Sequence, residues 1–328
     1  MRFIYSNPIT SNDLDNIRDP FIIRVKDRYY LTGSSPPFWS GDSPGVKLWE
    51  SNDLLSWKYL GLILDKKDMP ENAWCRERFW APEIAEINGR FYLTVNCRNE
   101  KYDKWHSVFI AVSDKITGPY TLLTKNKPAL IKSDVRREGD NPAAGIANDG
   151  SLFCDGGHNY LSFSNRYGIF AYEIKLPSCE LIGKMIHIVR PGSGKDWDTK
   201  IEAPYIVKQN GVYYCFYSSF TRNYEVGVAY SASMRGDWKK YSGNPIITPR
   251  PPVTACGHNC IFTGPDNAFW TAYHMTTEAD ETEHLAIDKI DFLKNGKIST
   301  KAPTVGRASV TLLYRMKKSR NFQSLSEI

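Results

Sequence analysis

The feature that most constrains this fold is a unit of strand, tight turn and aromatic strand that recurs along the chain. One copy begins at Pro20 and turns at 26–28, and another begins at Glu202 and turns at 209–211. The other copies begin near Pro82, Gly150 and Gly257. Turn residues between short β-branched and aromatic runs are typical of hairpins, whereas few segments show helical periodicity. The sequence therefore predicts an all-β fold built from repeats.

The spacing of the repeats indicates how they assemble. Five units separated by roughly 50–65 residues match the period of propeller blades with insertions. We therefore predict a five-bladed β-propeller in a single domain. Its blades are expected at residues 15–65, 78–125, 146–180, 200–245 and 255–300, with a closing strand at 308–316. Two β-sandwiches in tandem are the alternative, but a sandwich does not require an acid at the start of each repeat.

Acidic residues stand at the start of three of these units, and this pattern indicates catalysis. Asp19, Asp149 and Glu202 open the first, third and fourth blades. Because the first strand of each blade lines the central channel, we expect these side chains to meet at one end of the axis. Like charges at close range raise the pKa of at least one group, which yields a protonated acid beside an ionised base. Glycosidic cleavage needs such a pair, although an isolated Asp before Pro or Gly ordinarily belongs to a turn.

The order of five short motifs resembles a known family. Arg-Asp-Pro, Trp-Ala-Pro-Glu, Asp-Gly-Ser-Leu-Phe, Glu-Ala-Pro-Tyr and Gly-His-Asn-Cys-Ile-Phe follow one another at blade spacing. Together, over nearly the whole chain, they resemble glycoside hydrolase family 43, which contains β-xylosidases, α-L-arabinofuranosidases and arabinanases. The resemblance implies a five-bladed propeller that hydrolyses arabinofuranosyl or xylosyl linkages of plant-type saccharides with inversion at the anomeric carbon.

The resemblance also implies a role for each acid. Asp19 matches the general base that activates water, and Glu202 matches the general acid that protonates the leaving oxygen. Asp149 matches the aspartate that tunes the pKa of the acid and orients it. Inversion requires room for a water molecule, so the carboxyl groups of base and acid should stand about 6.5–9.5 Å apart.

Several further residues are predicted to contact the substrate. Phe38, Trp39 and Trp80 flank strand ends near the expected channel mouth, where aromatic faces stack on sugar rings. Glu83 opens the second blade and would either bind sugar hydroxyls or pair with an arginine. Arg222 follows an aromatic strand and is a candidate to bind a sugar hydroxyl, although a solvated or paired Arg is commoner.

His258, at the start of the fifth blade, is expected in the channel. The resemblance implies contact with substrate and with a metal or water cluster, often calcium, reached through water because imidazole is a poor ligand for a hard cation. A hydrogen-bonded histidine without metal is the alternative. Cys256 and Cys260 would share its strand face, which hints at zinc, but no fourth ligand is evident. We expect catalysis to require no cofactor.

Two places differ from the family pattern and leave the sugar specificity open. The third blade turns at 154–158 where a longer acidic turn is common, and blade five reads Glu283-His284 where an arginine often precedes the strand. A candidate rim loop at 189–199 precedes the acid of blade four. A propeller glycosidase acting on another sugar, such as galactan or an algal oligosaccharide, is therefore an alternative. A non-catalytic carbohydrate-binding propeller and a protein-interaction propeller are others, which the strand-opening acids disfavour.

Composition limits the classes of binding partner and the cellular compartment that we expect. The net charge of +6 over 328 residues forms no basic stripe, so we expect a carbohydrate partner and no nucleic acid. No apolar stretch is long enough to predict a membrane span. Seven cysteines, an odd number with several in strands, favour free thiols and a cytoplasmic location. A signal peptide removed from the sequence would instead imply a periplasmic or secreted protein. The sequence does not indicate an oligomeric state.

Overall fold

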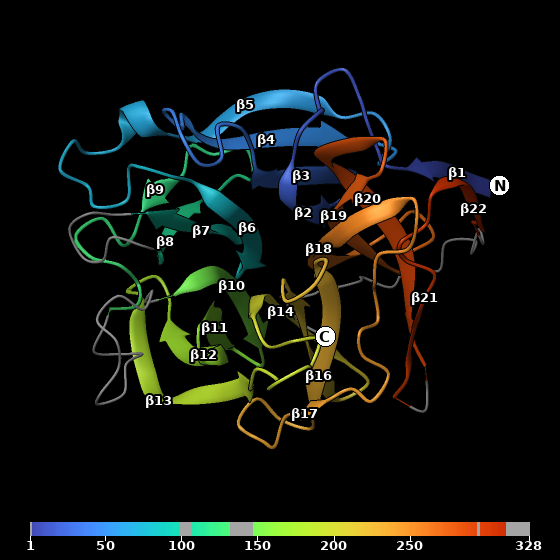
Figure 1. Ribbon diagram of the computed structural model, residues 1–328. Helices are drawn as coiled ribbons and strands as arrows, with labels where there is room; N and C mark the ends of the chain where they lie inside the picture. The colour runs from blue at the N-terminus through green and yellow to red at the C-terminus, as the bar shows by residue number, and fades with distance from the viewer. Residues whose placement is uncertain (1, 99–105, 132–146, 294–295, 313–328) are drawn as a thin grey trace, which may run out of the picture.

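The computed structural model describes residues 2–98, 106–131, 147–293 and 296–312. Within them, five four-stranded antiparallel sheets follow one another along the chain, each built from consecutive strands (Figure 1). This arrangement confirms the predicted five-bladed β-propeller. A 3-10 turn, η1 (Lys66–Asp68), follows the outer strand of blade one. No helix in the described residues is long and apolar enough to cross a membrane.

The strands of each blade are numbered from the axis outward. Blade one contains β2 (Arg18–Val25), β3 (Arg28–Ser34), β4 (Gly45–Ser51) and β5 (Lys58–Asp65). Blade two contains β6 (Trp80–Ile87), β7 (Arg90–Arg98), β8 (His106–Ser113) and β9 (Thr121–Leu122). Blade three contains β10 (Asn148–Asp155), β11 (His158–Asn165), β12 (Gly168–Lys175) and β13 (Glu180–Val189). Blade four contains β14 (Ile201–Gln209), β15 (Val212–Ser219), β16 (Glu225–Ser231) and β17 (Lys239–Lys240). Blade five contains β18 (Val253–Thr263), β19 (Phe269–Thr277), β20 (Asp280–Phe292) and β21 (Ile298–Thr300).

The first strands of the blades form the wall of the channel. They contact one another in the closed order β2, β6, β10, β14, β18 and back to β2. Buried apolar side chains fill the spaces between neighbouring sheets, as Phe153 of blade three and Ile206 and Tyr213 of blade four show. Each fully buried large apolar side chain contributes about 1.5–3 kcal/mol. The first strands are therefore held firmly from both sides.

The first strand and the last described strand of the chain meet beside blade five. Strand β1 (Arg2–Asn7) pairs with β22 (Gly306–Thr311) in a separate two-stranded sheet (Figure 1). The Ile9 N–H then donates to Leu285 O at 2.7 Å, and the Ile17 N–H donates to Glu283 O at 2.9 Å. The N-terminal segment thus borders the part of β20 that β21 does not cover, and it ties blade five to blade one.

The strand limits differ from the expected boundaries in two places. Strand β13 runs to Val189, beyond the predicted end of blade three at 180. Its exposed positions and Gly183 weaken the strand pattern, so the sequence did not reveal it. The predicted closing strand, 308–316, overlaps β22, but β22 pairs with β1 and ends at Thr311, and residues 313–316 lie outside the described range.

Every first strand contains a β-bulge at the same place. The pairing with the second strand is interrupted within 18–21, 80–83, 148–151, 202–205 and 257–260. The second residue of each four-residue bulge has a positive φ, from 43° to 56°: Asp19, Ala81, Asp149, Ala203 and His258. Asp and His adopt this conformation more readily than most side chains. The bulges re-aim side chains at the end of the channel, as bulges near active sites often do.

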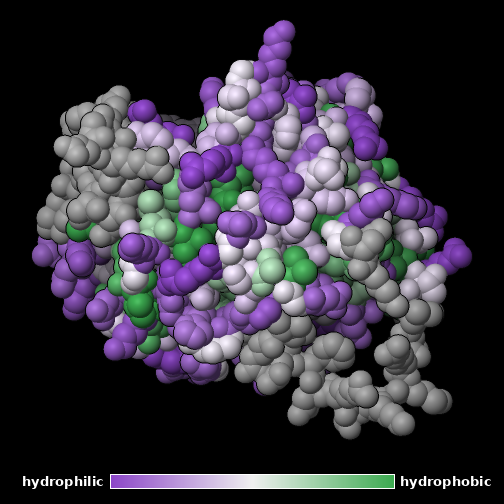
Figure 2. Space-filling view, turned by 90° about the horizontal axis from the view of Figure 1, so that it is seen from below, coloured by the Kyte–Doolittle hydropathy of each residue, from purple (hydrophilic) through white to green (hydrophobic). Residues whose placement is uncertain are grey.

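The exterior is mainly polar on the side drawn in Figure 2. Hydrophilic side chains cover most of that face, and hydrophobic ones show in patches between them (Figure 2). All seven cysteines are free thiols, and five of them are buried.

Candidate active site

The bulges bring four predicted side chains together at one end of the axis. The Nδ1 atom of His258 lies 3.0 Å from Asp19 Oδ1. The ligand-type atoms of Asp149, Glu202 and His258 lie within 4.8 Å of one another. These residues belong to blades one, three, four and five, so the ring closure makes them neighbours. The distance between the carboxyl groups of Asp19 and Glu202, expected at about 6.5–9.5 Å, stays a prediction.

Asp19 is a buried carboxylate among cations. Its Oδ1 atom lies 3.0 Å from the His258 ring and 3.6 Å from Arg18 Nε. Ser34 Oγ donates a 2.6 Å hydrogen bond to the other oxygen, Oδ2. Burial alone would raise the pKa of Asp19, but His258 and Arg18 outweigh it and hold the pKa below its usual value. Asp19 is therefore ionised and able to accept a proton.

Two histidines beside Asp19 differ in charge. Burial alone would lower the pKa of His258, but Asp19 and the other carboxylates of the site raise it to about 10. The Asp19 N–H donates a 3.1 Å hydrogen bond to Nδ1 of His274. Burial, assisted by the Arg18 charge, lowers the pKa of His274 to about 3. His258 is thus an imidazolium ion at neutral pH, whereas His274 is a neutral hydrogen-bond acceptor.

Asp149 and Glu202 form a pair of carboxyl groups that also lies beside His258. Asn148 Nδ2 donates to both carboxyl groups, at 3.0 Å to Asp149 Oδ2 and 3.3 Å to Glu202 Oε2. The Ala203 N–H donates to Asp149 Oδ2 at 3.1 Å, and the Tyr224 hydroxyl donates to Glu202 Oε1. Burial raises the pKa of both carboxyl groups, and the Glu202 charge raises that of Asp149 further. The pair therefore retains a proton near neutral pH, as a general acid requires.

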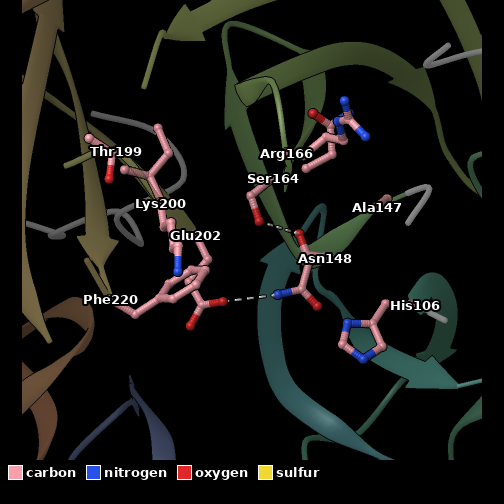
Figure 3. Close-up of a pocket in the computed structure, with 11 residues that line it drawn as sticks. His106, Ala147, Asn148, Ser164, Arg166, Thr199, Lys200, Glu202 and Phe220 are labelled. Atoms are coloured by element: carbon pink, nitrogen blue, oxygen red, sulfur yellow. Dashed lines mark hydrogen bonds between the residues drawn. The ribbon is translucent and has the colours of Figure 1, made fainter. Parts of the chain in front are cut away.

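A cavity of about 360 Å³ opens beside Glu202, between blades three and four. The residues on one side include Lys200, Glu202 and Phe220, and those on the other include Asn148 and Arg166 (Figure 3). Its volume lies in the range of ordinary small-molecule sites, about 300–1,000 Å³. A substrate in this cavity would reach the acid pair directly, because Glu202 and Asn148 form part of its wall.

The comparison with known sequences decides the family. The sequence profile described as "Glycosyl hydrolases family 43" matches residues 5–298. The chain belongs to glycosyl hydrolases family 43.

Relatives of this family 43 chain are distant in sequence. It is 27% identical over 254 residues to a xylosidase/arabinosidase of Butyrivibrio fibrisolvens, with 73% of this chain and 45% of that protein covered. It is also 27% identical over 276 residues to xylosidase/arabinosidase 43B of Humicola insolens, with 79% and 47% covered. The chain thus spans about half the length of these relatives. The crystal structure of a thermostable family-43 glycoside hydrolase matches with a TM-score of 0.73 at 27% identity, over 97% of this chain and 100% of that one.

Glu83 lies one layer further along the channel than the acids of the site. It is the fourth residue of its bulge, whereas Asp19 and Asp149 are second and Glu202 is first. The four acids therefore do not occupy equivalent positions, although each opens a blade. Burial raises the pKa of Glu83 to about 7, and its hydrogen-bond partner is Ser151. A contact between Glu83 and a sugar hydroxyl stays a prediction.

Two aromatic rings, the buried Phe21 and the half-buried Tyr205, occupy the same layer as Glu83. The aromatic rings of Phe21 and Tyr205, each the fourth residue of its bulge, pack edge to face at 6.0 Å between centroids. The Tyr205 hydroxyl donates to Ile261 O, which fixes its ring. These side chains belong to first strands and lie two residues beyond the second bulge position along the channel wall, so we expect substrate to enter from the end where the bulges lie.

The two tryptophans that were predicted to stack on sugar rings differ in exposure. Trp39 is 65% exposed, whereas Trp80 is 9% exposed and packs at 5.8 Å from Trp39 and 4.8 Å from His106. Trp80 Nε1 donates to Phe38 O, which holds the loop of Phe38 and Trp39 against blade two. Trp39, over which the Arg18 guanidinium lies at 5.4 Å, therefore offers more open ring surface for a sugar than Trp80.

Arg222 and the candidate rim loop have structural partners of their own. The Arg222 guanidinium binds both carboxylate oxygens of Glu225, at 2.7 and 2.8 Å. Its role as a sugar ligand stays a prediction. In the loop 189–199, Trp197 stacks on Tyr217 at 5.7 Å, and the buried Asp198 accepts a hydrogen bond from the Tyr217 hydroxyl. Thr199, at the end of this loop, forms part of the cavity wall.

The residues present do not fit a directly bound calcium ion. Calcium takes six to eight oxygen ligands, whereas the acid cluster offers two carboxylates and the ring of His258. The cluster already contains the imidazolium of His258, and donors from Asn148 and Tyr224 occupy both oxygens of Glu202. A water-mediated calcium contact of His258 stays a prediction. The zinc alternative is disfavoured because the bulge at 257–260 interrupts the alternation that would align Cys256, His258 and Cys260.

Sequence reasoning missed several residues of the site. Asn148, Tyr224, His274, Arg18 and Ser34 hold or charge the three acids, yet none was predicted as a site residue. Asn148 and Arg18 each stand directly before a predicted acid, so the first position of the bulge was the available signal. Tyr224 lies in a loop, His274 inside β19 and Ser34 at the end of β3, and no spacing in the sequence connects these positions with the acids.

Proposed function

We propose that this chain is an inverting glycoside hydrolase that cleaves xylosyl or arabinofuranosyl linkages of plant-type saccharides. The observation that carries the proposal is the opposite charge state of the acids at one end of the channel. Asp19 is ionised, whereas the pair of Asp149 and Glu202 retains a proton. Membership of family 43 and the names of the xylosidase/arabinosidase relatives support the substrate class.

In the proposed reaction, Asp19 removes a proton from a water molecule, whose oxygen then attacks the anomeric carbon. Glu202 transfers its proton to the glycosidic oxygen as the bond to the anomeric carbon breaks. The product is a hemiacetal of inverted configuration and an alcohol. The positive charge of His258 stabilises the ionised form of Asp19. When Asp19 takes the proton from water, His258 loses this negative partner, so the charges around Asp19 affect the free energy of the proton transfer.

Asp149 is proposed to position the acid. Two donors, the Ala203 N–H and Asn148 Nδ2, already point at Asp149 Oδ2 and stabilise its charged form. With Asp149 ionised, the shared proton resides on Glu202, next to the cavity. Asn148 bridges the two carboxyl groups and would keep their relative orientation during the transfer.

Product analysis tests the proposal. The protein is incubated with arabinoxylan, arabinan and xylo-oligosaccharides, and products are identified by chromatography while proton NMR follows the first anomer formed. Release of arabinose or xylose with inverted configuration is expected. Retention would contradict the roles of Asp19 and Glu202. A parallel panel of nitrophenyl pentosides and hexosides identifies the sugar, and turnover of hexosides alone would contradict the substrate class.

Removal of the acid gives a sharper test. Glu202→Ala is expected to lower kcat by about 10²–10⁴-fold on natural glycosides, whose leaving groups need protonation. Nitrophenyl glycosides, whose leaving group departs without a proton, should lose much less. An equal loss on both kinds of substrate would show that Glu202 is not the general acid.

A further inference from the structure

The cavity beside Glu202 carries positive charge without acidic partners. Arg166 and Lys200, both exposed, form part of its wall. In the described part of the chain, neither side chain forms an ion pair with a carboxylate. Three cations close to them in the chain do have such partners: Arg222 with Glu225, Arg235 with Glu173, and Lys240 with Asp198. The cavity wall therefore gathers two cations whose charge no described carboxylate neutralises.

The only acid in the described wall of the cavity does not cancel this charge. That acid is Glu202, whose pKa is raised by burial and which shares a proton with Asp149. The remaining polar residues of the wall include Asn148 and Ser164, which are neutral. Among the described residues, an anion in the cavity would thus meet two cations, and the one negative charge that the acid pair keeps lies on Asp149, which is not part of the wall.

The position of the cavity assigns it to one side of the scissile bond. Glu202 contributes to its wall, whereas Asp19 and Asp149 do not. A general acid protonates the oxygen of the leaving group, so the leaving sugar must lie beside Glu202 and away from the water that the base activates. The cavity is then the place of the leaving group.

We infer that this cavity binds a leaving-group sugar that carries an anionic substituent, a carboxylate or a sulfate. The inference rests on the proposed function, because it takes Glu202 as the general acid. The Arg166 guanidinium lies 4.8 Å over the Tyr167 ring, and this contact orients its planar donors. The Phe220 ring, 43% exposed, offers an apolar face on which the sugar stacks. Lys200 supplies the second charge from the opposite side of the cavity (Figure 3).

The expected preference is moderate because both cations are exposed. Two solvent-exposed ion pairs together favour the charged substrate by about tenfold, or ~1.4 kcal/mol. Salt screens such pairs, so the preference should fall as ionic strength rises.

A matched pair of substrates measures this preference. One is a pentosyl disaccharide whose leaving sugar is a uronic acid, and the other is the same disaccharide with its carboxylate reduced to a primary alcohol. A third substrate carries a sulfate ester on the reduced sugar, which separates the two kinds of anion. The readout is the ratio of kcat/KM for each charged substrate to that for the neutral one, in the wild type and in Arg166→Gln/Lys200→Gln. Lys239→Gln, on the exposed outer strand β17, is the control for net charge.

The expected ratio is about ten in the wild type at low salt for at least one anion, and about one in the double variant. The control should keep the wild-type ratio. A wild-type ratio near one for both anions, an unchanged ratio in the double variant, or an equal fall in Lys239→Gln would overturn the inference.

Failure of the proposed function would be seen separately, as no turnover of the neutral disaccharide or of any nitrophenyl pentoside. In that case calorimetric titration with the uronic acid disaccharide still tests the cavity. Salt-sensitive binding that the double variant loses would support the anion site. No binding, or equal binding by the double variant, would overturn it.

Discussion

Asp19 in blade one and Asp149 in blade three are the same residue in the same backbone geometry. Each is the second residue of its bulge, with φ of 53° and 52°, and each is buried. Their pKa values nevertheless shift in opposite directions, below the usual value for Asp19 and up to about 8 for Asp149. Backbone geometry and burial therefore cannot explain the difference.

The neighbours contributed by other blades explain it. Asp19 has Arg18 in its own strand and receives His258 from blade five. Asp149 has Asn148 in its own strand and receives Glu202 from blade four. Burial raises the pKa of both, and only Asp19 has enough positive charge nearby to overcome that effect. The propeller thus repeats one β-bulge, and the charge of the aspartate in each bulge depends on the residue before it and on the side chains of the other blades.

The largest effect is expected from the same substitution at both positions. Asn adopts a positive φ readily, so Asp19→Asn and Asp149→Asn should preserve the bulge. Asp19→Asn removes the base and should lower kcat by about 10³–10⁴-fold on every substrate, including those with good leaving groups. Asp149→Asn should cost about 10–100-fold and spare substrates with good leaving groups. Steady-state kinetics on nitrophenyl and natural glycosides measure both, and equal losses would remove the distinction between the two aspartates.

A smaller effect is expected from replacing His258, the cation that lies beside both Asp19 and the Asp149–Glu202 pair. The base works above its pKa and the acid works below its pKa, so activity lies between an acidic limb set by Asp19 and an alkaline limb set by the Asp149–Glu202 pair. The His258 charge lowers the pKa of all three groups. His258→Gln should therefore move both limbs to higher pH and reduce kcat/KM by about tenfold.

The pH profile of kcat/KM checks this prediction. His274→Gln is the matched comparison, because it replaces a ring that is neutral near pH 7 and should move the limbs less. Limbs that stay in place in His258→Gln would show that His258 does not set the charge of the acids.

The smallest effect is expected at two buried serines that tie the bulges together. Ser34 Oγ accepts from the Ala81 N–H at 2.8 Å and donates to Asp19, whereas Ser218 Oγ accepts from the His258 N–H at 2.7 Å. Either Ser→Ala change should lower the free energy of unfolding by about 1–3 kcal/mol, because a buried N–H loses its acceptor. Only Ser34→Ala should also move the acidic limb, to higher pH, since Asp19 loses a donor. Urea titration and the pH profile separate the two effects, and an equal shift in Ser218→Ala would contradict the assigned contacts.

Much of the fold could be predicted because each strand and turn of the repeat is indicated by a short, continuous stretch of sequence. Turn residues such as Asn210-Gly211 and the aromatic strands beside them mark hairpins, and their spacing marks blades. Outer strands were harder to find, as β13 shows, because exposed positions leave little alternation in the sequence.

For the candidate site, the sequence by itself determined which acids stand at the starts of blades, because the strand–turn pattern around Asp19, Asp149 and Glu202 is local. Only the tertiary structure decided the protonation states of the acids and their positions along the channel. The shift of Glu83 to a deeper layer depends on the bulge register, and the cationic state of His258 depends on three carboxylates from other blades. Electrostatic energies depend on distances through space, and residues as far apart in the chain as Asp19 and His258 become neighbours only when the ring closes.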